Sequence, residues 1–256
     1  MPYTPAHAVV ALLARRAGLP PAAVAAGAMA PDLPLFVMAR RQRQTHEAWA
    51  VLTLDPALAL GLLAGWELLI RPALVALAPD AVRARLPQAA GRPALPRFSG
   101  RLLAGLVAGT ASHVVWDSFT HPGRRGTRLV PLLERSMARR PVAAWLQEAS
   151  SAVGLAVLAG AAIRGRGSTP LGPAASSPLG VARRPLVLVA VLLVALSGVR
   201  SAWGSGDRVV RTLTVPLSAG TVLLAAIGAV LPVLERRRSR DTPGTSPALA
   251  PSAGST

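Results

Sequence analysis

Long apolar runs alternate with short polar breaks along most of the chain. Three runs in the first two thirds of the sequence, 50–70, 101–119 and 142–163, approach or reach the roughly 20 residues that a membrane-spanning helix needs. Two later runs, 185–199 and 212–234, carry almost no charge. The pattern therefore predicts an all-α fold, a polytopic helical membrane protein with about five long apolar helices.

Two shorter apolar segments precede these runs. The first, TPAHAVVALLARR, begins with Thr4 and Pro5, which are typical of a helix N-cap and a first helical position. The second, PPAAVAAGAMA, ends at Pro31. Neither segment is long enough to span a bilayer, so we predict two short N-terminal helices.

These elements divide the chain into four parts. A helical domain (1–163) is followed by a flexible linker (164–184), two further transmembrane helices (185–235) and a tail (236–256) that is basic and then disordered. In an alternative arrangement, residues 1–163 form a soluble helical domain that the last two spans tether to a membrane. The two arrangements differ in whether the first three long helices are spans or buried soluble helices.

Composition narrows the possible chemistry. The chain has 28 arginines, no lysine and a net charge of +17. The arginines lie in the breaks between apolar runs, without interleaved aromatic residues, so loops between membrane helices explain them better than a nucleic-acid partner does. The absence of cysteine excludes disulfides, thiolate catalysis and cysteine-type zinc sites. Any metal site must therefore be built from His, Asp and Glu.

The segment SHVVWDSFTH places three ionisable residues at the end of an apolar run. His113, Asp117 and His121 follow one another at spacings of four, so all three can face the same side of a helix. His121 can also lie in a turn, because Pro122 and Gly123 end the helix. A lone histidine on an apolar face is usually a hydrogen-bonded core residue, but ionisable residues within a membrane helix indicate a functional site.

The order of the helices brings the remaining histidines to the same place. His46 lies just before the run 50–70, and consecutive helices joined by a loop are antiparallel, so its start meets the end of the run 101–119. The segment that carries His7 and Asp32 precedes His46 and can stay at that end. Imidazole and carboxylate groups suit zinc, and also manganese or iron. The sequence therefore predicts a divalent-metal site.

Four motifs carry a resemblance to a known family. The motifs MPYTPAHAVV, GAMAPDLP, THEAW and SHVVWDSFTHPG resemble the domain-of-unknown-function 4184 family of bacterial membrane proteins, over residues 1 to about 235. The same order of residues appears in a related family of inner-membrane metal-dependent hydrolases. More distantly, the chain is similar to the all-helical zinc-dependent phospholipase C and single-strand nuclease group. The resemblance implies a multi-pass protein of the bacterial inner membrane.

The resemblance also implies which residues bind metal. In the phospholipase and nuclease group, an early His, an Asp, a His 14 residues later and an H-x-x-x-D pair supply the ligands. The residues of this chain that match, and that would hold one metal ion, are Asp32, His46, His113 and Asp117. His7 and Asp117 would contribute to a second ion. Zinc is the expected metal.

The chain departs from that group at the third zinc ion, which needs two more histidines and a glutamate. Only His121 is left for it here, with Glu148 or Glu134 as partners. The motif THE also stands where related sequences read THS, and Glu47 has no counterpart there. We include His121 among the metal ligands and expect fewer than three ions.

These residues lead to one functional hypothesis and one alternative. The hypothesis is a metal-dependent hydrolase with Asp32 and Asp117 as catalytic residues, in which Asp32, where it is not a firm ligand of the metal, orients or deprotonates a metal-activated water. We expect a phosphoester or lipid-like substrate at the membrane interface, contacts with membrane lipid, and no nucleic acid. The alternative is a non-catalytic membrane protein with a structural His/Asp metal or polar cluster. The chain has no G-x-S-x-G elbow and no glycine-rich phosphate loop.

Overall fold

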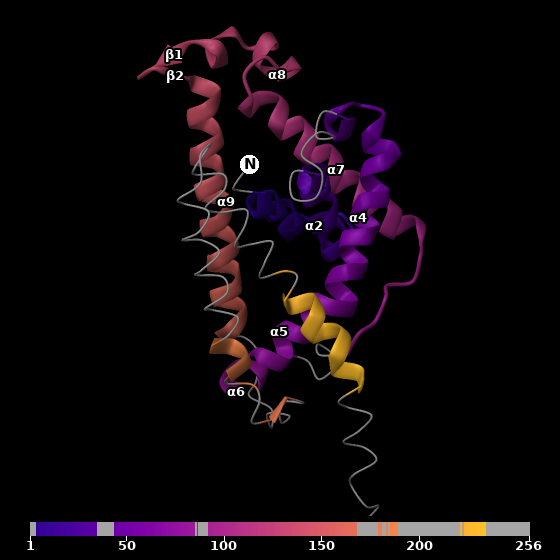
Figure 1. Cartoon of the computed structure of the whole chain (residues 1–256). Coiled ribbons are helices and arrows are strands. Elements are labelled where there is room, and N and C mark those ends of the chain that lie inside the picture. Colours follow the sequence, from indigo (N-terminus) through magenta and orange to yellow (C-terminus); the bar gives the residue numbers. More distant parts are fainter. Residues whose placement is uncertain are drawn as a thin grey trace, which may run out of the picture.

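The computed structural model describes most of the first two thirds of the chain and short parts of the remainder (Figure 1). The described residues are 4–34, 44–84, 86, 92–167, 179–180, 183, 185–188, 221 and 223–233. Most of them lie in helices, which confirms the prediction of a mainly helical protein.

The helical elements follow one another with short connections. The first are the 3-10 helix η1 (Thr4–Val10), α1 (Ala11–Ala14), α2 (Pro21–Met29), and the 3-10 helices η2 (Ala30–Asp32), η3 (Gln44–His46) and η4 (Ala50–Leu52). The next are α4 (Leu54–Gly65), the π-helix η5 (Trp66–Ile70), α5 (Arg71–Leu77) and α6 (Asp80–Arg83). The last are α7 (Gly100–Thr120), α8 (Arg125–Leu129), the 3-10 helix η7 (Pro131–Glu134), strands β1 (Ser136–Met137) and β2 (Arg140–Pro141), α9 (Val142–Gly167), and an apolar helix at Leu223–Val233.

The crossing of α2 and α7 forms the centre of the fold. A Cβ atom added at Gly27 would lie 2.1 Å from the carbonyl oxygen of Leu106, and one at Gly109 would lie 2.2 Å from that of Val24. The two backbones are therefore in direct contact, as small residues allow between packed helices. The surrounding core consists of Ala23, Ala26, Ala30, Ala59, Leu63, Leu102 and Leu106.

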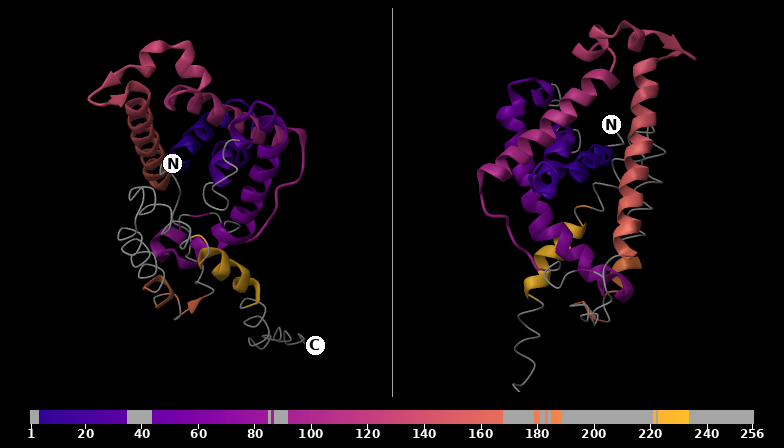
Figure 2. Two further views of the ribbon diagram at one scale, coloured as in Figure 1. Left: turned by 45° about the horizontal axis from the view of Figure 1, so that its top comes forward. Right: turned by 180° about the vertical axis from the view of Figure 1, so that it is seen from behind.

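The other long helices flank this crossing. In both Figure 1 and the rear view of Figure 2, α2 lies between α9 on one side and α4 on the other. The N-terminal η1 packs between α2 and α9. This arrangement brings η1, η2 and η3 next to the C-terminal half of α7.

The first long helix continues past the end that the sequence predicts. α4, η5 and α5 form one 24-residue helix, Leu54–Leu77, which extends seven residues past the predicted run 50–70. Pro72 cannot donate to the carbonyl four residues earlier, and its ring would clash with that carbonyl in a regular α-helix. The π-helix η5 widens the backbone just before Pro72, so the helix passes the proline without ending.

The segment 122–140, between the predicted runs 101–119 and 142–163, contains short regular elements. α8 and η7 occupy its first half, and β1 and β2 form a hairpin at its end. The two turn residues, Ala138 and Arg139, have positive φ angles of 50° and 66°. A two-residue hairpin turn requires this conformation, which no Gly or Asn in the sequence signals here.

Two helices within the described residues, Leu54–Leu77 and Val142–Arg164, are long and apolar enough to cross a membrane. α7 has 21 residues and nearly coincides with the predicted run 101–119. It is not one of these two helices, because its polar residues make it less apolar. The helix Leu223–Val233 is shorter, and most of 185–199 and all of 236–256 lie outside the described residues. Five membrane spans and the four-part division of the chain therefore stay predictions.

Candidate metal centre

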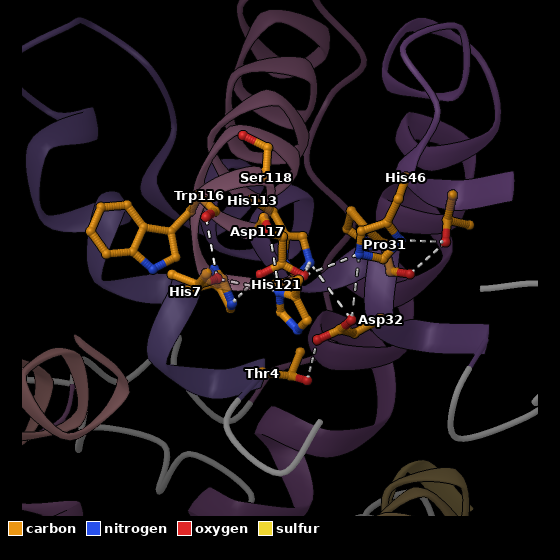
Figure 3. Close-up of polar contacts among 12 residues, drawn as sticks. Thr4, His7, Pro31, Asp32, His46, His113, Trp116, Asp117, Ser118 and His121 are labelled. Carbon is orange, nitrogen blue, oxygen red and sulfur yellow. Dashed lines mark hydrogen bonds and ion pairs between the residues drawn. The ribbon is translucent and has the colours of Figure 1, made fainter. Parts of the chain in front are cut away.

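Four of the six predicted metal ligands meet at one buried point (Figure 3). One ligand atom from each lies within 4.8 Å of the others, and the four are Asp32, His46, His113 and Asp117. Asp32 and His46 come from η2 and η3, and the other two lie one turn apart on α7. This group could bind a metal ion.

The distances between nitrogen and oxygen atoms fit a single ion. His46 Nε2 lies 3.3 Å from Asp117 Oδ2 and 3.9 Å from Asp32 Oδ1. His113 Nε2 lies 3.5 Å and 3.6 Å from the same two oxygen atoms. Ligand atoms that bind a tetrahedral ion at about 2 Å are about 3.3 Å apart. Small side-chain shifts would therefore complete the site.

His113 is fixed with its Nε2 atom toward this point. The side chain is fully buried, and Nδ1 donates to the carbonyl oxygen of Ala28 at 2.7 Å. Since a neutral imidazole carries one proton, Nε2 is then an acceptor, and it has no hydrogen-bond partner among the described residues. A buried acceptor without a partner is destabilising, and a metal ion would satisfy it.

His46 is held in the same tautomer by its neighbour. The hydroxyl of Thr45 donates to the carbonyl oxygen of Pro31 at 2.7 Å, and the same hydroxyl oxygen lies 3.3 Å from His46 Nδ1. Because the hydroxyl proton is used on Pro31, the oxygen accepts from Nδ1. His46 Nε2 faces the carboxylates and lies at hydrogen-bond distance, 3.3 Å, from Asp117 Oδ2, so a metal ion bound there would take the place of a proton.

Asp32 is oriented by Thr4, a residue for which the sequence predicted a different role. Its Oδ2 atom accepts a hydrogen bond from the hydroxyl of Thr4 at 2.7 Å, and its Oδ1 atom has no hydrogen-bond partner in the described part of the chain. Thr4 was expected to be a helix N-cap, but η1 already begins at this residue. The hydroxyl instead turns the second carboxylate oxygen toward the histidines.

We expect Thr4→Val to weaken metal binding by about 10-fold, the lower end of the effect of outer hydrogen-bond partners on metal affinity. The substitution keeps the branched shape and leaves Asp32 Oδ2 without its donor. Titration of metal-free protein against a chromophoric chelator would measure the change. Thr53→Val is the matched control, because the Thr53 hydroxyl bonds the carbonyl oxygen of Trp49, away from the site. Equal affinities in the two variants would show that Thr4 has no role.

The other two predicted ligands, His7 and His121, lie beside the group. His7 Nε2 is 3.6 Å from Asp117 Oδ1, and its ring centroid is 4.1 Å from that of His113. His121 follows the end of α7 in an extended conformation, and its Nδ1 atom lies 3.5 Å from Asp117 Oδ2. Asp117 is therefore the common neighbour of all four histidines in the chain.

Burial decides the charge of these two flanking rings. Desolvation, with His113 nearby, lowers the pKa of His7 to about 4, so the ring is neutral at neutral pH. Desolvation also lowers the pKa of His121, and the carboxylate of Asp117 only partly opposes it. Neutral imidazoles are the form that binds a metal ion.

The glutamates considered as further ligands lie elsewhere. Glu148 forms an exposed ion pair with Arg140 at 2.7 Å, and Glu134 accepts a hydrogen bond from the backbone nitrogen of Gly123. Glu47 follows His46 but its side chain is exposed. None of the three belongs to the four-residue group.

One buried acid near the centre was given no role from the sequence. Asp55, in the first turn of α4, is fully buried, and neither of its carboxylate oxygens has a hydrogen-bond partner within the described residues. His46 and His113 are close enough to act on it electrostatically. The signal in the sequence was a charged residue inside an apolar run, which indicates function by default.

Comparison with known proteins gives one match. A family model whose description is a domain of unknown function matches residues 1–234, a range that contains all four motifs and every candidate ligand. Neither a curated protein nor a solved structure matches the chain. The kinship to metal-dependent hydrolases and to the phospholipase and nuclease group therefore stays a prediction.

Proposed function

The chain belongs to the DUF4184 family, whose description names no activity, and we propose from the site that it is a metal-dependent hydrolase of the membrane. The observation that carries the proposal is the buried group of two carboxylates and two imidazoles whose Nε2 atoms face them. Such a group can also have a purely structural role. Here, however, the flanking His7 and His121 are partly exposed, so the group is not fully enclosed by the protein.

The ligand set suits zinc best. Imidazole nitrogens and carboxylate oxygens are donors that zinc prefers, and the same donors also accept manganese or iron. The residues that converge on the position of the ion are Asp32, His46, His113 and Asp117. A catalytic zinc ion takes three protein ligands and leaves its fourth position to water, so His46, His113 and Asp117 would hold the ion while Asp32 faces the water. When bound, such an ion lowers the pKa of a coordinated water and polarises a phosphoryl or acyl oxygen.

The exposure of the side chains indicates how a substrate reaches the site. His46, His113 and the two aspartates have side chains at most 3% exposed, whereas His7 and His121 are 16% and 13% exposed. A substrate would approach past these two rings. Asp32, whose Oδ1 atom lacks a partner, is the candidate base that orients or deprotonates the attacking water. Asp117 positions the histidines around it.

The apolar helices support a membrane setting. Leu54–Leu77 and Val142–Arg164 each have the length and composition of a span, and only 22% and 11% of their apolar windows are buried inside the protein. We propose a multi-pass protein of the bacterial inner membrane, with its site near the interface. Membrane lipid is then a neighbour, and the substrate is a phosphoester or lipid-like molecule, lipid-linked or small.

The test is the metal content and the turnover of the full chain purified in detergent. We expect stoichiometric bound metal, hydrolysis of a chromogenic phosphodiester, and loss of both after chelation. Asp117→Asn should lower turnover by about 100-fold or more, because it removes the negative charge of the residue that contacts all four histidines. Glu148→Gln, an exposed acid on α9, is the control and should change neither quantity.

A structural metal is the alternative that one observation favours. The group joins η2, η3 and α7, so an ion there would tie the N-terminal segment to the central helix. That role predicts bound metal, loss of folded protein on chelation, and no turnover of any phosphodiester. Turnover that depends on added metal would exclude it.

A further inference from the structure

Two pockets of opposite character flank the metal centre. The first has a volume of about 630 Å³ and is lined by His46, Glu47 and the arginines that follow α7. The second has a volume of about 320 Å³ and is lined by His7 and by apolar residues of η1 and α9. Both volumes are in the range of small-molecule sites. His46 and His7 contact the two oxygens of the same carboxylate, Asp117, from the two sides.

We propose that the site binds a membrane amphiphile, with its phosphate-type head group in the arginine-lined pocket and its apolar chain in the pocket beside α9. The bond to be cleaved would then lie at the metal centre between the two pockets. This inference rests on the proposed hydrolase function and specifies its substrate class. It assigns the recognition of the substrate to residues that neither bind the metal nor activate water.

The first pocket carries a surplus of positive charge. Arg124, Arg125 and Arg128 line it, against a single carboxylate from Glu47. The ion pairs that arginines form within the described residues involve other side chains, namely Arg71, Arg83, Arg140 and Arg183. Arg128 also lies close enough to the exposed Glu134 carboxylate to help lower the pKa of that acid, and the planar donors of all three guanidinium groups match phosphate oxygens. A phosphate-type group is the ligand that complements this charge.

The second pocket has the opposite lining. Its lining is mainly apolar and includes Val9, Val10, Val153 and Val157. Trp116 and Ser150 also line it, and the Trp116 indole donates to the Ser150 hydroxyl at 3.3 Å. Part of the wall is α9, one of the two helices that could cross a membrane, and Val153 is 62% exposed there. An apolar chain can therefore enter from the lipid phase, where it exchanges contacts with lipid tails for packing against the helices.

The juxtaposition of the pockets argues for one molecule in both. Figure 3 shows Trp116 and His7 on one side of Asp117, and His46 on the other. A head group beside His46 and a chain beside His7 would place the linkage between them at Asp117, the residue common to both histidines. A free phosphate would use only the first pocket, and a neutral lipid only the second.

The experiment compares three probes on the full-length protein in detergent, with and without metal. The probes are dioctanoylglycerol phosphate, glycerol 3-phosphate for the head alone, and dioctanoylglycerol for the chain alone. We expect the amphiphile to bind at least about 10-fold more tightly than either half, because both pockets contribute to its affinity. Binding should persist in metal-free protein, since the protein alone forms the two pockets.

Two variants separate the pockets. Arg124→Gln combined with Arg128→Gln should weaken the amphiphile and glycerol 3-phosphate by about 10-fold or more, and leave dioctanoylglycerol unchanged. Val153→Trp fills the apolar pocket. It should weaken the binding of dioctanoylglycerol and leave the binding of glycerol 3-phosphate unchanged. The controls are Arg135→Gln with Arg139→Gln, and Leu155→Trp, which make the same changes outside both pockets. The helical circular dichroism signal reports that each variant is folded.

The outcomes of these experiments test the hydrolase function and the amphiphile site separately. Absence of metal or turnover, with the pocket variants acting as expected, would overturn the hydrolase and leave the amphiphile site standing. Metal-dependent turnover with no effect of either pocket variant would overturn the amphiphile site alone. Displacement of the amphiphile by a single-stranded oligonucleotide, with the same dependence on the arginines, would also overturn it in favour of a nucleic-acid phosphate.

Discussion

Replacing His113 by alanine should abolish metal binding. We expect an affinity loss of more than 100-fold, beyond the range of about 10–100-fold seen when only an outer partner of a ligand is removed. His113 is the most constrained of the candidate ligands, because it is fully buried and its Nδ1 atom is bonded to the carbonyl oxygen of Ala28.

The measurement is the thermal stabilisation that metal gives. At a metal concentration of 100 times the Kd, the wild-type protein should gain about 2.7 kcal/mol, whereas a variant bound 100-fold more weakly gains about 0.4 kcal/mol. Val114→Ala, the adjacent position on α7, is the control and should keep the full gain. Stabilisation by metal that is unchanged in His113→Ala would remove His113 from the ligand set. A variant that fails to fold can be replaced by Asp117→Asn, which keeps the side-chain volume.

Replacing Gly109 by alanine should destabilise the whole domain. The added Cβ atom would lie 2.2 Å from the carbonyl oxygen of Val24 and 2.7 Å from the backbone nitrogen of Ala28, so two helices must separate. We expect a loss of about 3 kcal/mol or more, at the upper end of ordinary overpacking, because rigid backbone rather than a mobile side chain is in the way. The metal site should weaken as well, since α2 leads directly into η2 and Asp32.

Gly61→Ala is the matched control for this prediction. Gly61 is also inside a helix, α4, but nothing lies within 4 Å of its added Cβ atom. The same substitution should therefore stabilise the protein by about 0.5–1 kcal/mol through helix propensity alone. Denaturation of both variants, followed by circular dichroism in detergent, gives the comparison. Equal stability of the two variants would contradict the direct backbone contact between α2 and α7.

Much of the candidate site could be predicted because it depends on local spacing and on helix order. The spacing of four between His113 and Asp117 places them on one side of any helix. The position of His46 before one helix, and of that pair near the end of the next, brings them together in any antiparallel arrangement. The structure has this arrangement, and the helical character of most described residues up to 167 also follows from the apolar pattern.

Other features depend on contacts that the sequence does not display. A threonine at the start of a helix has the same pattern whether it caps the helix or, like Thr4, bonds an aspartate 28 residues away. Pro72 is a normal helix-ending signal, and only the π-helix before it lets the chain continue. The arginines after α7 look like any basic loop until the fold places them at the pocket beside His46.

The carboxylates of the centre also set an electrostatic balance. Asp32 and Asp117 together bring two negative charges into a buried region, and the histidines around them contribute none when neutral. A single divalent cation balances these two charges, which a medium of low polarity favours. The buried Asp55 nearby adds at most one further negative charge, so a second cation would still leave an excess of positive charge unless another anion accompanied it. The centre is therefore suited to one resident ion, and an anionic substrate would be the natural companion of any second one.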